Sequence, residues 1–326
     1  MTADGSVGTS SMGSGSRPGI VDVHVHLTRD LAQERLVFPR PGYADHWRWA
    51  NGERINAHLE AEQIDGVVML NYMDVHRMAE SRVAREPEVD LEGLWEELRA
   101  RVARFNDWGC ELGASNARLV PFMCVDAGLF PKVEGMMAEL ERCLAQGARG
   151  VKIHPGLSRF DPGDRRMWPL YERMQEAELP ILSDTGSLTS APDGTPYGRT
   201  VQFIPALEAF PRLRLIMAHM PGAYWDERIG IAARFPSVLF DTAGGFNAAG
   251  WSARDGQRAC AIEDAERLVR TIGVERVLFG SDAPAHDQRP QIQQILGLSL
   301  SEREQDLILG GNAKALLGLG SPARAS

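Results

Sequence analysis

Two histidines lie two residues apart near the start of the chain, in the segment Asp22-Val23-His24-Val25-His26. Side chains two residues apart on a β-strand point to the same side, so both imidazoles can reach one ion. Imidazole nitrogen is a common ligand of divalent transition metals. We therefore predict that His24 and His26 bind a metal ion, the alternative being two hydrogen-bonded core histidines. Asp22 would share their face, either orienting an imidazole or serving as a polar cap.

Three more apolar segments end in a residue that can bind metal or carry a proton. Asp282 follows the segment from Arg276, and we predict that it binds the metal and acts as the general base. Asp184 ends the segment from Pro180, where it is either a further oxygen ligand or a turn cap. His219 ends the segment from Leu213, and we predict that it binds metal or polarises the bond that breaks.

Lys152 and His154 lie two residues apart at the end of a fourth segment and therefore share one face. Lys152 could hold a substrate carboxylate or, if carbamylated, bridge two metals, and His154 could bind substrate or metal. The alternative is a salt-bridged lysine and a structural histidine. We predict that both bind substrate, together with Trp47 from an aromatic segment discussed below.

The elements that must position these residues are short apolar, β-branched runs with amphipathic stretches such as 132–146 between them. This alternation is typical of βα units and a parallel sheet. We predict eight strands, at residues 20–27, 66–71, 118–125, 150–154, 180–184, 213–219, 237–241 and 276–282. Eight such units indicate an α/β fold, a distorted TIM (β/α)8 barrel, whose functional residues lie at the C-terminal ends of the strands. An open doubly wound sheet is the alternative, but no GxGxxG turn follows the first strand.

Two segments are longer than a minimal barrel needs, and both leave strands at the predicted C-terminal face. Residues 28–58 contain Phe38, Tyr43, Trp47 and Trp49, and we interpret them as a lid or pocket wall, or else as a packing layer or homodimer contact. Residues 185–200 could also cover substrate. Residues 1–19 are rich in Gly and Ser and predict a flexible tail, which leaves 20–326 as a single domain.

Composition excludes several classes of function. The 326 residues carry a net charge of −9 and no cluster of Lys and Arg, so nucleic acid is not an expected partner. No stretch reaches the roughly 20 apolar residues of a membrane span, and no signal peptide is recognisable. The four cysteines form no CxxC pair, as expected for reduced thiols. We expect a cytoplasmic protein that acts on a small molecule.

Four segments together resemble the amidohydrolase-related branch of the amidohydrolase superfamily, which includes aminocarboxymuconate-semialdehyde decarboxylase and related aromatic-acid decarboxylases. They are DVHVHL, GVKIHPG, MAHMPG and LFGSDAP, and residues 308–318 are similar to the family's last helix. The resemblance implies that His24, His26 and Asp282 bind the metal and that His219 activates substrate or water. The segment PILSDTG departs from the pattern, because Asp184 replaces a ligand histidine and so leaves the metal's identity open.

These residues lead to one main hypothesis for function and two alternatives. We predict a metal-dependent hydrolase that cleaves a C–N or C–O bond of a small molecule with metal-activated water. Non-oxidative decarboxylation of an unsaturated or aromatic acid is the first alternative. A non-catalytic, ligand-binding barrel is the second, motivated by the altered position 184. The expected cofactor is one divalent metal per chain, zinc first and manganese or iron as alternatives.

Overall fold

The computed structural model describes residues 19–29, 49–185, 197–220, 225–246 and 262–319. Eight parallel strands form one sheet in the order of the sequence. They are β1 (Ile20–Val25), β2 (Ile64–Leu70), β3 (Leu119–Cys124), β4 (Gly150–Ile153), β5 (Ile181–Ser183), β6 (Leu215–Met217), β7 (Leu239–Asp241) and β8 (Val277–Leu278). All eight predicted strands are therefore present, several of them shorter than predicted.

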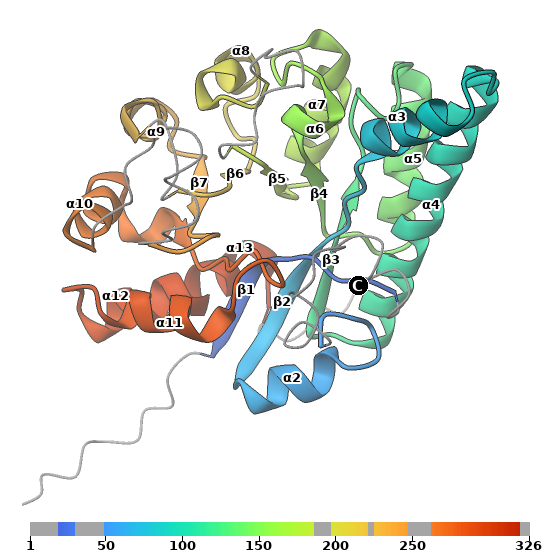
Figure 1. Cartoon of the computed structure of the whole chain (residues 1–326). Helices are drawn as coiled ribbons and strands as arrows, with labels where there is room; N and C mark the ends of the chain where they lie inside the picture. Colours follow the sequence, from blue (N-terminus) through green and yellow to red (C-terminus); the bar gives the residue numbers. More distant parts are fainter. Residues whose placement is uncertain (1–18, 30–48, 186–196, 221–224, 247–261, 320–326) are drawn as a thin grey trace, which may run out of the picture.

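Backbone hydrogen bonds connect β1 to the residues that follow β8 and bring the two ends of the sheet together. Val23 N–H donates to the Phe279 carbonyl at 2.9 Å, and Asp282 N–H donates to the His24 carbonyl at 2.9 Å. The strands consequently form a nearly closed ring with helices around it, as Figure 1 shows. The predicted TIM barrel is confirmed.

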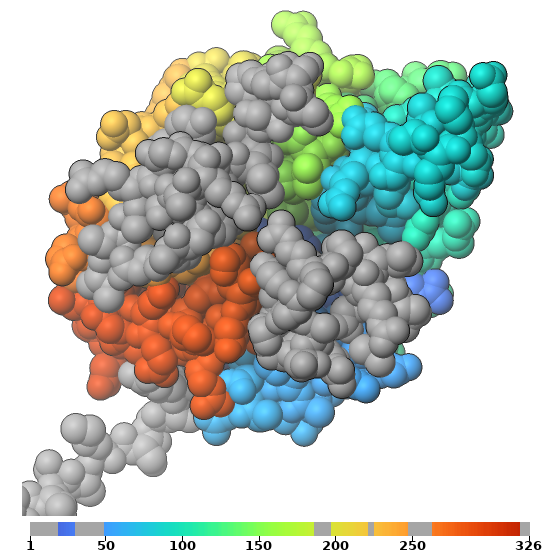
Figure 2. Space-filling view, in the orientation of Figure 1, coloured from blue at the N-terminus to red at the C-terminus, as the bar shows by residue number. Residues whose placement is uncertain are grey.

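Helices lie around the ring, between successive strands and after β8. They are α2 (Ile55–Ala61), α3 (Val75–Arg85), α4 (Leu91–Ser115), α5 (Val133–Ala145), α6 (Pro155–Ser158), α7 (Trp168–Glu176), α8 (Ile204–Ala209), α9 (Trp225–Arg234), α10 (Ile262–Ile272), α11 (Gln288–Leu296), α12 (Glu302–Asp306) and α13 (Asn312–Leu317). α4 begins at Leu91 because the Asp90 carboxylate accepts the free N–H groups of Glu92 and Gly93. None of the described helices has both the length and the apolar character needed to span a membrane. α3 and α4 stand at one edge of the face drawn in Figure 2.

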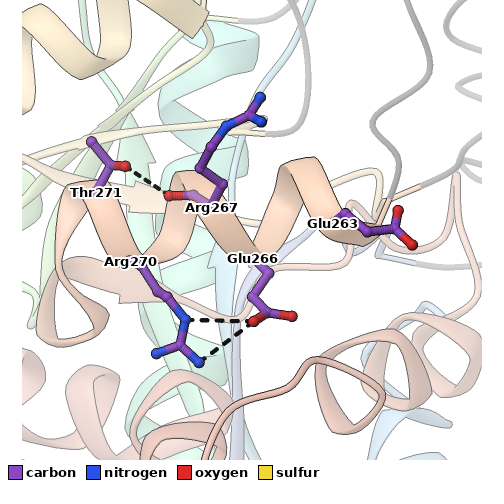
Figure 3. A pocket seen from close by; sticks show the side chains of 5 residues that line it. All are labelled: Glu263, Glu266, Arg267, Arg270 and Thr271. Atoms are coloured by element: carbon purple, nitrogen blue, oxygen red, sulfur yellow. Dashed lines mark hydrogen bonds and ion pairs between the residues drawn. The ribbon is translucent and has the colours of Figure 1, made fainter.

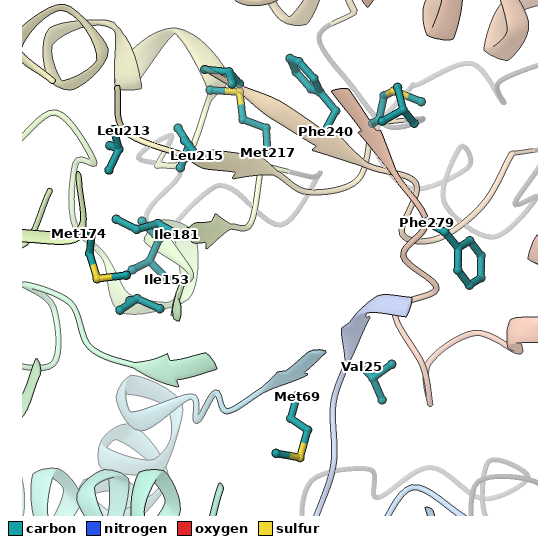
Figure 4. Close-up of a cluster of buried hydrophobic side chains, with 14 of the residues drawn as sticks. Val25, Met69, Ile153, Met174, Ile181, Leu213, Leu215, Met217, Phe240 and Phe279 are labelled. Atoms are coloured by element: carbon teal, nitrogen blue, oxygen red, sulfur yellow. The ribbon is translucent and has the colours of Figure 1, made fainter. Parts of the chain in front are cut away.

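Two apolar layers hold the barrel, and the residues of most strands alternate between them. The outer layer packs strand residues such as Met69, Ile153 and Met217 against the helices, and part of it is drawn in Figure 4. The inner layer fills the ring with residues such as Val68 and Leu182. This alternation follows the two-residue repeat of a strand. In β4 the neighbours of Lys152, Val151 and Ile153, belong to the outer layer, so the Lys152 side chain points into the ring.

β1 differs from the regular strand expected from the sequence. Its pairing with β2 shifts register between Asp22 and Val25. Val23 packs in the inner layer, whereas Val25 packs in the outer layer. A regular strand would place Val23 and Val25 on the same face, so β1 departs here from the two-residue repeat. The irregularity turns Asp22 toward Ser281 and Gln288 and leaves His24 directed at the strand ends.

Several predictions concern segments outside the described residues. These are the Gly/Ser-rich tail, Trp47 with most of the aromatic segment, the first part of the 185–200 loop, and Cys260. The other three cysteines, Cys110, Cys124 and Cys143, are buried and form no disulfide.

Candidate metal centre

His24, His26 and Asp282 meet at the C-terminal ends of β1 and β8. One ligand atom from each lies within 4.8 Å of the other two. The Nε2 atoms of His24 and His26 are 3.5 Å and 3.3 Å from the same atom, Asp282 Oδ1. The His24 side chain is 1% exposed, and those of His26 and Asp282 are 26% and 14% exposed, so the group is open to a small molecule on one side. The structure thus brings three of the predicted metal ligands together.

Hydrogen bonds fix which nitrogen of each imidazole carries the proton. His24 Nδ1 lies 2.8 Å from Asp241 Oδ2, and His26 Nδ1 lies 3.2 Å from the Leu70 carbonyl oxygen. Both partners are acceptors, so each Nδ1 donates a hydrogen bond. Burial lowers the pKa of His24 to about 4, the charge of Lys152 acting in the same direction, so its ring is neutral at pH 7.

These observations test whether the residues suit a divalent cation. His24 Nε2 is buried and, among the described residues, has no hydrogen-bond partner, so its lone pair is available to a cation. His26 Nε2 lies 3.3 Å from the same Asp282 oxygen that His24 Nε2 approaches to 3.5 Å. Two imidazole nitrogens and a carboxylate oxygen are a donor set used by zinc, manganese and iron. The residues therefore fit a metal ion.

His219 and Asp184 form an ion pair beside these three residues. His219 Nε2 is 3.0 Å from Asp184 Oδ2, and its Nδ1 is 3.2 Å from the Ala243 carbonyl oxygen. Because both neighbours accept hydrogen bonds, both nitrogens carry protons. Burial lowers the pKa of His219, but the Asp184 carboxylate outweighs that effect and raises it to about 9. The ring of His219 lies 4.9 Å from that of His24, centroid to centroid, so this cation borders the predicted metal site.

His154 contacts the same carboxylate from β4. Its Nδ1 accepts the N–H of Leu157 at 3.3 Å, so its Nε2 carries the proton, and Nε2 lies 3.4 Å from Asp184 Oδ2. Burial lowers the pKa of His154 to about 4, which leaves the ring neutral. Burial would raise the pKa of Asp184, yet His154 and His219 hold it well below its usual range. Asp184, predicted as a metal ligand, thus lies between two imidazoles.

Lys152 is buried at 1% exposure in the ring of strands. Burial lowers the pKa of its ammonium group, and the carboxylates of Asp184, Asp241 and Asp282 act in the opposite direction. The Lys152 side chain therefore lies near the predicted metal site, where these three carboxylates interact electrostatically with its ammonium group.

His219 and Asp282 share an unusual backbone conformation. Each has φ of 63°, in the left-handed region that non-glycine residues rarely adopt. His219 N–H donates to Asp241 Oδ1 at 2.8 Å, and Asp282 N–H donates to the His24 carbonyl at 2.9 Å. Residues held in this region often lie at functional sites, and the two side chains here face the candidate centre.

Asp241 is a residue whose importance the sequence analysis missed. It is fully buried at the end of β7, where it binds His24 through Oδ2 and the backbone N–H groups of His219 and Ala243 through Oδ1. One carboxylate thus orients two predicted site residues that are 195 positions apart in the sequence. The sequence does place an acidic residue at the end of the seventh predicted strand, as it does at the fifth and eighth, and this position could have identified Asp241 as a candidate site residue.

Asp22 connects the centre to the segment after β1. Its carboxylate accepts hydrogen bonds from Ser281 Oγ and Gln288 Nε2, each at 2.6 Å, and from the N–H of His24 at 3.0 Å. Gln288 Oε1 in turn contacts His58 Nε2 at 2.8 Å, and the ring of His58 stacks on that of Trp49. Asp22 therefore supports the strand ends through the backbone of His24, whereas the ring of His24 is oriented by Asp241.

A depression of about 470 Å³ lies on the exposed side of α10, and its described lining residues all belong to that helix. Figure 3 shows its lining residues Glu263, Glu266, Arg267, Arg270 and Thr271. Arg270 pairs with Glu266, and Arg267 pairs with Asp264. None of its described lining residues is a predicted site residue, so we do not interpret it as the active site.

Comparisons with known proteins identify the family and the fold of this chain. A family model described as amidohydrolase matches residues 21–319. A search of curated proteins found no match. Dihydroxybenzoic acid decarboxylase from Polaromonas sp. JS666, solved with manganese and 2-nitroresorcinol, has a TM-score of 0.67 and 17% identity over 93% of this chain and 98% of its own. 5-Carboxyvanillate decarboxylase from Sphingomonas paucimobilis has a TM-score of 0.64 and 17% identity over 92% and 99%.

A third solved structure, an uncharacterized TIM-barrel protein from Bordetella bronchiseptica, has a TM-score of 0.65 and 19% identity over 92% of this chain and 98% of its own. At these identities the solved structures establish the fold, whereas the family model covers nearly the whole described chain. With the fold, the family model and the histidine–aspartate cluster in agreement, the chain belongs to the amidohydrolase family.

Proposed function

We propose that this protein is a metal-dependent hydrolase that cleaves a C–N or C–O bond of a small molecule. The observation that carries the proposal is the buried Nε2 of His24, which has no hydrogen-bond partner among the described residues and faces Asp282 beside the imidazolium of His219. We propose that His24, His26 and Asp282 hold one metal ion. When bound, such an ion polarises the substrate and lowers the pKa of water to near 7.

The protein residues then divide the proton transfers between them. Asp282, which interacts with both histidines and whose pKa is lowered by them, is ionised and can accept a proton through a carboxylate oxygen. His219 carries a proton on Nε2 and can stabilise negative charge or donate to the leaving group. Asp241 keeps His24 in the tautomer that exposes Nε2. Hydrolysis requires a base that takes a proton from water and an acid that protonates the leaving group, and Asp282 and His219 can supply the two.

For the cofactor we propose zinc, bound once per chain, with manganese as the competitor. Two imidazoles and one carboxylate match zinc sites that leave a position open for water. The presence of manganese in the Polaromonas structure supports the competitor. Asp184 as a fourth ligand remains a prediction, since its carboxylate lies against His154 and His219.

Elemental analysis tests the metal proposal directly. We expect about one zinc or manganese per chain in wild type, and loss of the metal in His24→Ala. His76→Ala serves as the matched control, because His76 lies in α3 with its ring against Trp95. Asp184→Asn decides whether that carboxylate is a ligand. Wild-type protein that takes up no metal, even when it is refilled with zinc or manganese, would contradict the proposal.

Decarboxylation is the second candidate, and two observations favour it. Solved structures similar to this chain are named as decarboxylases of aromatic acids. Lys152, buried within the barrel, is suited to hold an acidic substrate, and His219 could deliver a proton to carbon as CO₂ leaves. Turnover in ¹⁸O-labelled water separates the two reactions: a hydrolase incorporates one ¹⁸O into product, whereas a decarboxylase releases CO₂ and consumes no water.

A further inference from the structure

We propose that Lys152 and the hydroxyl of Tyr72 form a subsite for the carboxylate of a small organic acid, next to the metal centre. The inference rests on the proposed function and deepens it by naming the substrate class as carboxylic acids. Tyr72 follows β2, and Lys152 belongs to β4. Neither the family model nor the similar structures assign a role to either residue.

Lys152 is a buried cation that lacks an anion of its own. Its side chain is 1% exposed and, among the described residues, makes no hydrogen bond or ion pair. The three nearby carboxylates are already engaged, because Asp184 and Asp241 bind histidines and Asp282 faces two more. An ammonium group without a partner is costly in a protein interior. A bound carboxylate would supply the missing partner.

Tyr72 contributes a second donor without an acceptor. Its hydroxyl oxygen is buried and has no hydrogen-bond partner in the described protein. Tyr171 shows the ordinary arrangement, since its hydroxyl is also buried but donates to the Pro162 carbonyl at 2.7 Å. Buried tyrosine hydroxyls usually find such a partner. Tyr72 has no such partner among the described residues, so its hydroxyl is available to a bound ligand.

The two donors belong to one part of the barrel. The ring of Tyr72 lies 5.1 Å from that of His154, which follows Lys152 by two residues and points to the same side. Between β2 and β4 lies β3, whose last residue, Cys124, is the register partner of Lys152. His154 also reaches Asp184, the partner of His219, so the proposed subsite borders the candidate centre.

The chemistry of this pair selects for a carboxylate over a neutral group. A carboxylate has two acceptor oxygens, one for the ammonium group and one for the hydroxyl, and its charge compensates Lys152. Burial lowers the pKa of Lys152, and an adjacent anion would favour its charged form. A neutral amide of the same shape offers one acceptor and no charge. Substrates with a carboxylate beside the bond that reacts are therefore expected.

The test measures binding without turnover. We would titrate the metal-loaded full-length protein by calorimetry with benzoate and with propionate, and use benzamide as the neutral control. Wild type is expected to bind the carboxylates and not benzamide. Tyr72→Phe should weaken carboxylate binding about 10-fold or more, as expected for one hydrogen bond to a charged group. Lys152→Met should abolish it.

Thermal unfolding of the same variants separates a ligand contact from a structural one. Tyr72→Phe removes a hydroxyl without a partner, so the melting temperature should stay the same or rise. Tyr171→Phe, the matched control, breaks a buried hydrogen bond, so its melting temperature should fall while carboxylate binding is unchanged.

Equal binding of benzoate and benzamide, no saturable carboxylate binding by wild type, or unchanged carboxylate binding in Tyr72→Phe would each overturn the subsite. Metal content, measured on the same samples, distinguishes this failure from failure of the proposed function. Metal present without carboxylate selectivity refutes the subsite alone. Absence of metal refutes the proposed metal-dependent reaction.

Discussion

Asp241→Asn is the substitution that most directly tests the geometry of the candidate metal centre. Asparagine can keep its oxygen toward the N–H groups of His219 and Ala243, which places its amide nitrogen opposite His24 Nδ1. That nitrogen donates and cannot accept, so it favours the His24 tautomer in which Nδ1 accepts and Nε2 carries the proton. The lone pair that should bind the metal is then lost.

The size of the effect follows from the contact. The hydrogen bond from His24 to Asp241 is 2.8 Å long, and the two side chains are 1% and 0% exposed, so water cannot replace the lost acceptor. Loss of a carboxylate that supports a ligand histidine typically costs 10–100-fold in metal affinity. We expect the upper part of that range, which corresponds to about 2–3 kcal/mol of binding free energy.

Competition with a chromogenic chelator measures the zinc affinity of wild type and variant at one pH, and circular dichroism verifies that both are folded. Asp126→Asn is the matched control. Asp126 is also fully buried, but it binds Ser158 and two backbone N–H groups at the end of β3, so its metal affinity should remain that of wild type. Folded Asp241→Asn protein with wild-type affinity would refute the proposed role of Asp241.

Three further outcomes are expected. Removal of the metal by a chelator should lower the melting temperature, with about 2.7 kcal/mol of stabilisation lost when the free metal had been at 100 times its Kd. In the metal-free protein the folded-state pKa of His219 is about 9, above its unfolded value of 6.5, so its pairing with Asp184 stabilises below pH 6.5 and is lost as pH rises through 9. Urea unfolding should show this decline, and His219→Gln should remove it. Gly280→Ala would place a Cβ 3.0 Å from His24 Cβ and should lower the free energy of unfolding by about 1–3 kcal/mol. Gly230→Ala, with no atom near its Cβ, should leave that free energy unchanged. Equal stabilities of the two variants would contradict the packing.

The barrel was predictable because local patterns specify it. Each strand is a short apolar run, and each polar residue that follows a run reaches the same face once parallel strands are aligned. His24, His26 and Asp282 could be grouped on this basis although 256 positions separate the last two. The three residues that the structure brings together are all residues that the sequence analysis had named as metal ligands.

The remaining parts of the site depend on contacts that no local pattern contains. The register shift in β1, which separates Val23 from Val25, arises where that strand meets the residues after β8. In the sequence, Asp241 is one of several polar residues at strand ends. Only the structure shows that one of its oxygens binds His24 and the other accepts the N–H of His219. The missing partner of Tyr72 is likewise a property of the assembled interior.

The left-handed backbone of Asp282 has a consequence for protein engineering. A left-handed conformation costs most non-glycine residues about 1–2 kcal/mol, although aspartate tolerates it better than others. Glycine at position 282 would relieve this backbone strain, so a library selected only for heat resistance should become enriched in Asp282→Gly. Such a selection would discard the ligand first, and a screen for robust variants of this barrel therefore needs metal retention as a second criterion.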